Sequence, residues 1–454
     1  MNLLTDKIRP MYVRYLIAAT GSALVYSVFG IVDAAMIGNY HGPVGNAALA
    51  VFSPIWAAAY CLGLLSGVGG AVLFGNARGK GDEERAQAYF SVTVLFGAIL
   101  SVLTVLIIGL FRMPLLRLFG GDDMLIPLCA AYLSPILFAL PCCIFVNIWS
   151  SFLRNDGAPA LPAAAVIAGG CLNILGDYLL IYRMDMGIRG AGIATAAGLY
   201  LSNLIMLLHF LRRKNTLRLV RARREMLREI VRSGFPTAVN DLALGILAVL
   251  FNRQIMARLG TEALAVYSIA TLIATIIQCV AYGIGQAAQP ILSENHGAAQ
   301  YGRVRECMRC GIWSSFALGT AAAALVFLLP APLVSLFTAP TAELLAISPG
   351  ILRVYGLSFL FLPFNIFATF YFQAIMKERV ALAGSVARGA VISGALVLLL
   401  PALFGPGSIF WAMPVSEMAV CGFLLLFMRK QQRLSVADGE HNNGDEGPVF
   451  QNKG

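Results

Sequence analysis

The chain has 454 residues, of which 59% are hydrophobic and only 12% are charged, and its mean hydropathy is +0.77. Soluble domains carry about 25% charged residues, so this composition excludes a soluble enzyme, a nucleic-acid-binding protein and a secreted domain. It indicates a polytopic membrane protein. The net charge of +10 is interpreted as an excess of Lys and Arg on one side of the membrane and not as a sign of nucleic-acid binding.

The apolar runs predict an all-α fold of twelve membrane-spanning helices. Each is long enough for the roughly 20 residues that a bilayer crossing needs. They lie near residues 15–38, 47–74, 89–111, 127–151, 162–182, 190–211, 235–256, 263–290, 310–330, 347–374, 383–404 and 409–428. Met1–Pro10 is short and polar, so no secretory signal peptide is expected.

Lys and Arg are distributed unevenly between the two sides of these spans. Twenty-five lie in the N-terminus, the even-numbered connections and the C-terminal tail, whereas seven lie in the odd-numbered connections and adjoining helix ends. Arg388 falls inside a span. Because Lys and Arg accumulate on the cytoplasmic side of membrane proteins, both termini are expected in the cytoplasm.

An internal repeat divides the chain into two halves. Residues 45–53 read GNAALAVFS and residues 260–268 read GTEALAVYS, with six of nine positions identical. Chance similarity between two apolar stretches is the alternative. Because six spans is an even number, the halves enter the membrane from the same side and form parallel repeats, as in many secondary transporters.

The repeat and the charge pattern predict four regions. They are an N-terminal six-helix lobe (1–211), a basic cytoplasmic linker (212–232), a C-terminal six-helix lobe (233–430) and a disordered cytoplasmic tail (431–454). The linker has nine Lys or Arg and two Glu, and an amphipathic helix on the inner leaflet is one possibility for it.

Ionisable residues inside the first-half spans are the main functional candidates, because a charged residue within the bilayer usually faces a cavity or a partner. Asp33 lies in span 1, and Asn173 and Asp177 lie four residues apart on one face of span 5. Thr195 opens span 6. These oxygens suit a monovalent cation or a protonated carboxyl. The alternatives are an interfacial position for Asp33, an interhelical hydrogen bond for Asp177 and helix packing for Thr195.

The second half has a different set of polar residues within its spans. Asp241 follows Asn240 in span 7 and is the natural acid of this half, although it lies near the start of the helix. Glu417 in span 12 is expected to pair with Arg388 in span 11. Asn240, Asp241 and the amides of spans 8 and 10 are placed in the substrate cavity. For the amides, helix–helix hydrogen bonding is the equal alternative. They include Gln278, Gln286, Gln289, Asn365 and Gln373.

Motifs of soluble enzymes are missing from the sequence: it has no Walker A, HExxH or GxSxG pattern, and its four His are scattered. A lone CxxC at Cys307 and Cys310 lacks the two further ligands that zinc needs. Neither catalysis nor a cofactor is therefore expected. Transport driven by ATP would need a soluble nucleotide domain, so an ion gradient is the expected energy source.

Seven segments of the sequence carry a resemblance to a known family. The segments that carry it are VDAAMIG (32–38), GNAALAVFS (45–53), GKGDEERA (79–86), LRNDG (153–157), NILGDYLLIY (173–182), GIRGAGIAT (187–195) and SENHGAA (293–299). In this order and spacing they resemble the MATE family, the multidrug and toxic compound extrusion antiporters, and within it the MepA-type bacterial branch. The resemblance covers roughly residues 10–430.

The resemblance implies two six-helix bundles in a V shape that alternate between outward-facing and inward-facing states. In members with a cation site in the N-terminal lobe, the ligands are an Asp on the first helix, an Asn and an Asp on the fifth and a Thr on the sixth. Those positions here are Asp33, Asn173, Asp177 and Thr195, which would be the site of Na⁺ if Na⁺ is the coupling ion.

The sequence departs from the family in two places. Some members bend the first helix at a proline before its Asp, but residues 16–24 contain none, so Gly21 is the remaining candidate for a bend. Others bind a cation at a seventh-helix Glu and a tenth-helix Asp. Leu244 occupies the first position and span 10 has no acid, so coupling in the second lobe would depend on Asp241.

We therefore expect a monomeric multidrug antiporter of the bacterial inner membrane that exchanges Na⁺ or H⁺ for organic cations. A lipophilic cation would bind between the lobes against aromatic rings and carboxylates. The alternatives are a lipid-linked precursor flippase of the same superfamily, which would need several basic residues in its cavity, and a membrane-embedded enzyme. The sequence does not choose between Na⁺ and H⁺ or define the drugs.

Overall fold

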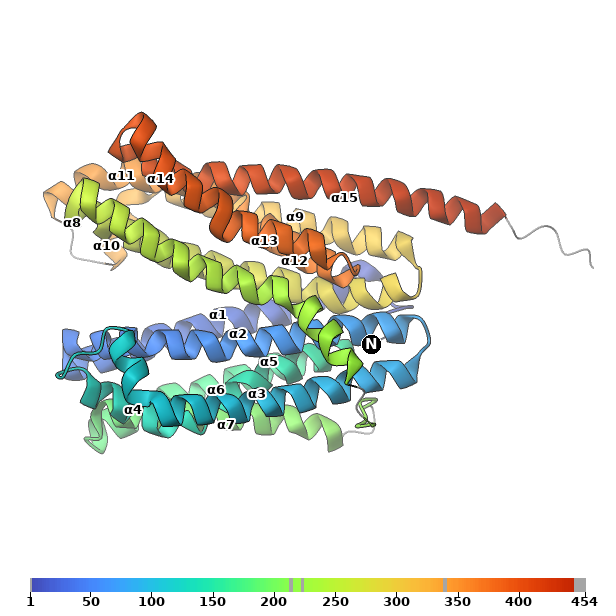
Figure 1. Ribbon diagram of the computed structural model, residues 1–454, viewed down its shortest axis with the longest axis horizontal. Helices are drawn as coiled ribbons and strands as arrows, with labels where there is room; N and C mark the ends of the chain where they lie inside the picture. Colours follow the sequence, from blue (N-terminus) through green and yellow to red (C-terminus); the bar gives the residue numbers. More distant parts are fainter. Residues whose placement is uncertain (1, 212–214, 222–223, 338–340, 445–454) are drawn as a thin grey trace, which may run out of the picture.

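The computed structural model describes residues 2–211, 215–221, 224–337 and 341–444. The side chains of Tyr26, Asp241, Phe337 and residues 434–444 lie outside that description. The described chain is helical and contains no strand, and its helices form two bundles that together make a V (Figure 1). The expectation of an all-α, two-bundle membrane protein is confirmed.

The first lobe is built from α1 (Ile8–His41), α2 (Pro43–Gly79), α3 (Glu83–Leu118), α4 (Ile126–Leu137), α5 (Leu140–Asn155), α6 (Ala160–Asp177), η1 (Tyr178–Arg183), α7 (Gly187–Leu207) and η2 (Leu208–Leu211). The second lobe is built from α8 (Glu225–Gly297), α9 (Tyr301–Leu328), α10 (Pro330–Phe337), α11 (Ala342–Gly356), η3 (Leu357–Leu360), α12 (Leu362–Ala374), α13 (Glu378–Val386), η4 (Ala387–Val391), α14 (Ile392–Phe404), η5 (Pro406–Trp411) and α15 (Ala412–Gly444).

The number of membrane spans agrees with the predicted twelve. Ten helices in the described residues are long and apolar enough to cross a membrane, and the pair α4 and α5, bent by 49°, gives an eleventh. One of the ten, α8, has 73 residues and contains two spans, because it folds back at Gly260, whose φ is +81°. Phe251 and Tyr267 stack 5.0 Å apart across this turn.

Two local sequence features explain these breaks. A left-handed φ is accessible to glycine at little cost, which suits Gly260 to a reversal. The α4–α5 break lies just before Pro141, the second residue of α5, where a missing N–H and a fixed φ favour a new helix start. By contrast, α1 is a single continuous helix that runs through Gly21.

The two lobes contact each other closely at one end of the molecule. Small residues let α2 and α8 approach: a Cβ on Gly79 would lie 2.0 Å from the Glu294 carbonyl oxygen, and one on Gly234 would lie 1.9 Å from the Leu65 carbonyl oxygen. Met226 and Ile230 of α8 also belong to a hydrophobic core that is otherwise made by the first lobe and by Leu217 of the connecting segment. Close backbone approach through small residues is a common way to join membrane helices.

Hydrogen bonds between lobes accompany this packing, and we refer to them as the closed-end contacts. Arg154 Nη1 donates to Gln286 Oε1 at 2.7 Å, and Gln289 Nε2 donates to the Val68 carbonyl oxygen at 3.2 Å. Asn76 Nδ2 donates to the Ala374 carbonyl oxygen at 2.9 Å. Gln286 and Gln289 therefore join the lobes, which is the second of the two roles that the sequence allowed for them.

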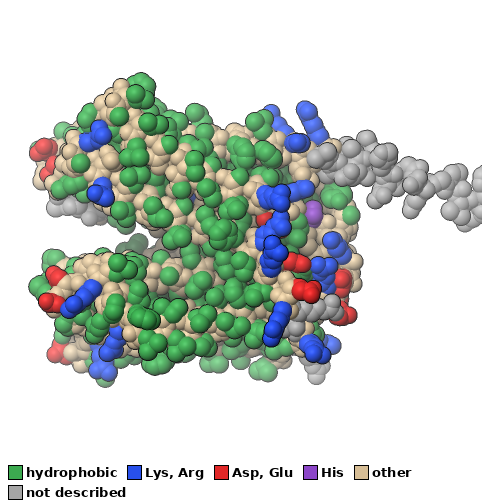
Figure 2. All heavy atoms as spheres, viewed as in Figure 1, with side chains coloured by type: hydrophobic (Ala, Val, Ile, Leu, Met, Phe, Trp, Pro, Cys, Tyr) green, Lys and Arg blue, Asp and Glu red, His purple; other side chains and the backbone are tan. Residues whose placement is uncertain are grey.

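The opposite end is open. Figure 2 shows a cleft between the lobes there, and Lys and Arg gathered at the closed end beside the start of α8. The apolar side chains that cover the outside of both bundles are consistent with contact with lipid.

The predicted linker 212–232 is non-helical in its first described part and helical from Glu225, where α8 begins. Residues 215–221 are non-helical and run along α3: Gln87 Nε2 donates to the Thr216 carbonyl oxygen at 3.0 Å, and the Arg218 N–H donates to Gln87 Oε1 at 2.8 Å. At the other end of the chain, α15 continues to Gly444, so helix occupies 431–444 where the sequence predicts disorder. The remainder of that predicted tail, 445–454, lies outside the described residues.

Candidate functional site

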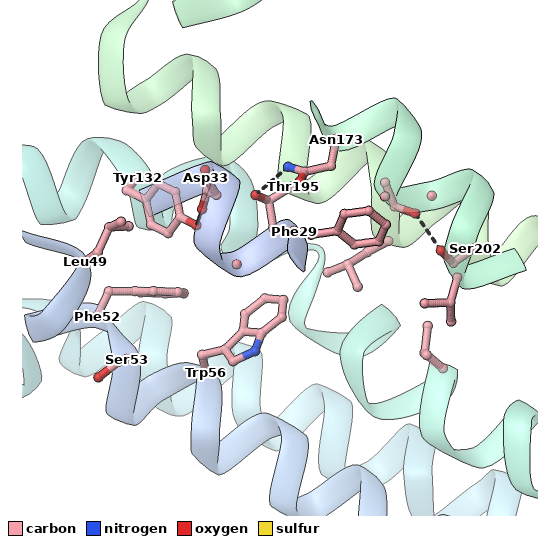
Figure 3. Close-up of a pocket in the computed structure, with 17 residues that line it drawn as sticks. Phe29, Asp33, Leu49, Phe52, Ser53, Trp56, Tyr132, Asn173, Thr195 and Ser202 are labelled. Carbon is pink, nitrogen blue, oxygen red and sulfur yellow. Dashed lines mark hydrogen bonds between the residues drawn. The ribbon is translucent and has the colours of Figure 1, made fainter. Parts of the chain in front are cut away.

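A cavity of about 300 Å³ lies within the first lobe and is lined by residues of α1, α2, α4, α5, α6 and α7 (Figure 3). Its lining includes Asp33, Asn173 and Thr195, three of the four residues predicted to bind a cation. The fourth, Asp177, follows Asn173 by one helical turn on α6. The structure therefore brings the four predicted residues into one region of the lobe.

Asp33 reaches this region from α1. The Tyr132 hydroxyl of α4 donates to Asp33 Oδ2 at 2.9 Å (Figure 3), and Tyr132 is itself buried. The other carboxylate oxygen, Asp33 Oδ1, is buried and has no hydrogen-bond partner within the described chain. The Tyr132 hydroxyl thus orients the Asp33 carboxylate, and Asp33 Oδ1 remains able to accept a further hydrogen bond or to bind a cation.

Asn173 and Thr195 meet because α6 and α7 pack closely. Gly169 and Gly198 face each other, and a Cβ on Gly198 would lie 2.5 Å from the Gly169 carbonyl oxygen. At this separation Asn173 Nδ2 donates to Thr195 Oγ1 at 3.2 Å. The amide oxygen of Asn173 and the hydroxyl oxygen of Thr195 both belong to this part of the cavity wall.

Substituting Gly198 with Ala should destabilise the lobe. The new methyl group would overlap backbone atoms of α6, and overpacking of this kind costs about 1–3 kcal/mol. We expect a lower thermal unfolding temperature for the purified protein in detergent. The control is Gly21→Ala on α1, where a Cβ would meet nothing within 4 Å; equal unfolding temperatures for both variants would contradict the close-packing argument.

Asp177 is fully buried at the end of α6, with 0% of its surface exposed. Neither of its carboxylate oxygens has a hydrogen-bond partner within the described residues. The next six residues form the π-helix η1, a geometry that is frequent at functional sites. Together Asp33 and Asp177 have three buried carboxylate oxygens without a partner in the described chain. Both carboxylates can stay charged only if a cation accompanies them, and otherwise at least one of them takes up a proton.

Aromatic rings make up another wall of the cavity. Phe29, Phe52 and Trp56 point into it (Figure 3), and Phe52 packs edge-on against Tyr132 with ring centroids 4.9 Å apart. The ring of Phe29 lies directly over Gly170, where a Cβ would be only 1.5 Å from it. Among the described residues, no Lys or Arg lines the cavity, so its one charged lining residue there is the acidic Asp33, beside amide and hydroxyl groups and apolar walls.

Sequence reasoning missed Tyr132 and these three aromatic residues. Phe29 lies four residues before Asp33 on α1, and that spacing is the one available signal, since such residues share a helix face. Tyr132 is separated from Asp33 by 99 positions, and no local pattern reports a contact of that kind.

Three of the polar residues predicted for the second-lobe cavity, Asn240, Asn365 and Gln373, are buried and take part in contacts between helices. Asn240 Nδ2 donates to the Tyr282 hydroxyl at 2.9 Å, Asn365 Nδ2 donates to Glu417 Oε2 at 2.6 Å, and Gln373 Nε2 donates to the Ser233 carbonyl oxygen at 2.8 Å. Gln278 is partly buried, and the Asp241 side chain lies outside the described residues. None of the described side chains in this group lines the first-lobe cavity, and the place of the group in a substrate cavity stays a prediction.

The sequence model of the MatE family matches residues 18–179 and 236–397 of the chain. The chain belongs to the MatE family. The two matched segments are of equal length and fall one in each lobe, in agreement with the repeat found in the sequence. MatE proteins are membrane transporters, so the expectation of a transporter rather than an enzyme is confirmed.

Two curated MatE relatives are similar over most or much of the chain. "Multidrug export protein MepA" of Staphylococcus saprophyticus is 25% identical over 424 residues, which cover 92% of this chain and 93% of the relative. "Probable multidrug resistance protein YoeA" of Bacillus subtilis is 26% identical over 336 residues, covering 71% and 72%. The resemblance to the MATE family and its MepA-type branch is confirmed.

Among solved structures, an "outward-facing conformation of a multidrug resistance MATE family transporter of the MOP superfamily" superposes with a TM-score of 0.86. It is 21% identical in sequence and covers 96% of this chain and 98% of its own. The MatE fold, with its two bundles in a V, is therefore shared.

Proposed function

We propose that this transporter is a secondary active multidrug exporter, which exchanges Na⁺ or H⁺ for organic cations by alternating access between its two lobes. The observation that carries the proposal is the group of three unpartnered, buried carboxylate oxygens of Asp33 and Asp177 beside the cavity. The names of the relatives, a multidrug export protein and a probable multidrug resistance protein, support the same cargo.

Different residues of the site would bind the coupling ion and the drug. Asp33, Asp177, Asn173 and Thr195 offer carboxylate, amide and hydroxyl oxygens, which a hard monovalent cation prefers, or carboxylates that accept a proton. The rings of Phe29, Phe52 and Trp56 offer faces to a lipophilic organic cation. Because two cations would repel each other at the same carboxylates, the ion and the drug would compete for the site. Competition of this kind is what exchange of one for the other requires.

Exchange also requires that the ion bind the two conformations with different affinity. A tenfold preference corresponds to about 1.4 kcal/mol. In the present conformation the lobes touch at the basic end and are open at the other. If the basic end faces the cytoplasm, as the distribution of Lys and Arg favours, this is the outward-facing state of a monomer in the bacterial inner membrane, with both termini inside.

A flippase for lipid-linked precursors is the alternative cargo assignment. Phosphate groups would need basic side chains in the cavity, and the described residues that line it include none. The acidic cavity therefore favours cationic cargo.

The proposal is tested in proteoliposomes that contain the purified protein. We expect uptake of ethidium against its gradient when an opposing Na⁺ gradient or an opposing pH gradient is imposed, and the effective gradient identifies the ion. Protein-free liposomes and liposomes with equal ion concentrations on both sides are the controls. If folded protein transports ethidium under neither gradient, the antiporter proposal fails and the flippase becomes the leading assignment.

A further inference from the structure

The second lobe contains its own buried polar cluster, which the proposed transport function does not use. It consists of Asn240, Asn365, Arg388 and Glu417, here called the C-lobe cluster, and each member has at most 5% of its surface exposed. Arg388 Nε donates to Glu417 Oε1 at 2.6 Å, and Arg388 Nη1 donates to Asn240 Oδ1 at 2.9 Å. The guanidinium thus lies between a carboxylate oxygen and an amide oxygen.

The C-lobe cluster and the first-lobe site occupy corresponding helices. In the first lobe Asp33, Tyr132, the Asn173–Asp177 pair and Thr195 come from the first, fourth, fifth and sixth spans, which are α1, the α4–α5 pair, α6 with η1, and α7. In the second lobe they come from the first arm of α8, α12, η4 and α15, which are again the first, fourth, fifth and sixth spans of their half. The equal matched segments of the family model follow the same repeat.

The two positions differ in what their oxygens face. In the first lobe three carboxylate oxygens have no partner within the described chain. In the second lobe a side chain of the protein itself supplies the positive charge, and a guanidinium remains protonated in proteins. Arg388 therefore meets the same kinds of oxygen, carboxylate and amide, that would surround an exchangeable cation in the first lobe.

We propose that Arg388 is a built-in cation that fills the second-lobe counterpart of the coupling site, so that each chain exchanges its coupling ion at the first-lobe site alone. This inference rests on the proposed function of Asp33 and Asp177. It implies that the second lobe contains a latent site for Na⁺ or a proton, which becomes available when the guanidinium is removed.

The residues around Arg388 are suited to such a site. Without the guanidinium, Glu417 would be a buried carboxylate, which must gain a cation or a proton to remain buried. Asn240 Oδ1 would be released, and Asn365 Oδ1 is already buried without a partner in the described part of the chain. One carboxylate and two amide oxygens resemble the set proposed for the first lobe.

The test uses the full-length protein in detergent and two readouts. Equilibrium binding of radioactive Na⁺ counts bound sodium ions, and infrared difference spectroscopy on adding Na⁺ or changing pH detects a protonated carboxyl group. In the Asp33→Asn, Asp177→Asn background, which removes the first-lobe carboxylates, neither signal is expected. Adding Arg388→Ala should restore one bound Na⁺ per chain or one protonated carboxyl group.

Two controls connect the restored signal to the C-lobe cluster. Adding Glu417→Gln to the triple variant should abolish the signal, and Arg388→Lys in place of Arg388→Ala should not produce it, because Lys keeps a built-in charge. If Arg388→Ala does not fold, Arg388→Gln removes the charge and keeps hydrogen-bonding groups, and the same restoration is expected.

The inference is overturned if the folded triple variant gives neither signal. It is also overturned if the double variant already gives a signal that Glu417→Gln removes, because the second-lobe site would then be exchangeable in the native protein. If instead the double variant gives a signal that persists with Glu417→Gln, the first-lobe assignment under the proposed function has failed. An additional signal that requires both Glu417 and the loss of Arg388 would then still support the inference.

Discussion

Replacing Asp33 with Asn is expected to abolish ion-driven drug efflux while leaving the protein folded. Asn has nearly the same shape, and its side-chain oxygen can still accept the hydrogen bond that Tyr132 donates at 2.9 Å. What disappears is one negative charge. At 4 Å and an effective dielectric constant of about 20, that charge contributes about 4 kcal/mol to holding a cation, which corresponds to roughly three orders of magnitude in affinity.

The measurement is ethidium efflux from a host that lacks its own drug pumps, together with the amount and unfolding temperature of the purified variant. The matched control is Asp185→Asn, at an exposed position whose carboxylate accepts a hydrogen bond from Tyr40. Its φ of +55° suits Asn as well as Asp, so wild-type efflux is expected. Wild-type efflux by Asp33→Asn would show that the ion is bound elsewhere.

The outline of the fold could be predicted from the sequence because it depends on local properties. Apolar length gives the spans, and the repeat at 45–53 and 260–268 gives the two halves. The spacing of Asn173 and Asp177 places both on one face of α6, since residues four apart lie one above the other. These features need no knowledge of which helices touch.

Contacts between distant segments could not be predicted in this way. The Tyr132–Asp33 hydrogen bond joins residues 99 positions apart, and the aromatic wall takes its residues from α1 and α2. The contacts of the second-half amides could not be predicted either. Gln286 and Gln289 join the lobes, whereas Asn365 donates a hydrogen bond to Glu417 inside one lobe. Residue type alone does not separate these roles, because each depends on the neighbour that the fold supplies.

Replacing Gln286 with Glu is expected to slow transport about five- to tenfold by stabilising the closed-end contacts. Gln286 Oε1 accepts a hydrogen bond from the buried Arg154 guanidinium at 2.7 Å. A carboxylate in that place would turn the contact into an ion pair, and a hydrogen bond between charged groups is about 1 kcal/mol stronger than one to a neutral partner. Because the lobes must separate at this end during alternating access, the added stability reduces the fraction of molecules that open.

Gln289→Glu is the matched control, since it makes the same chemical change one turn further along α8. Gln289 Nε2 donates to the Val68 carbonyl oxygen at 3.2 Å, so a carboxylate there would lose a donor and face a carbonyl oxygen. We expect it to loosen the closed end. Spin labels at Lys80→Cys and Lys377→Cys, two exposed positions on different lobes, in a background without the nine native Cys, would report the inter-lobe distance. The population with a short distance should grow in Gln286→Glu and shrink in Gln289→Glu. A shift in the same direction for both variants would mean that the overall charge of the interface, rather than these individual hydrogen bonds, controls its opening.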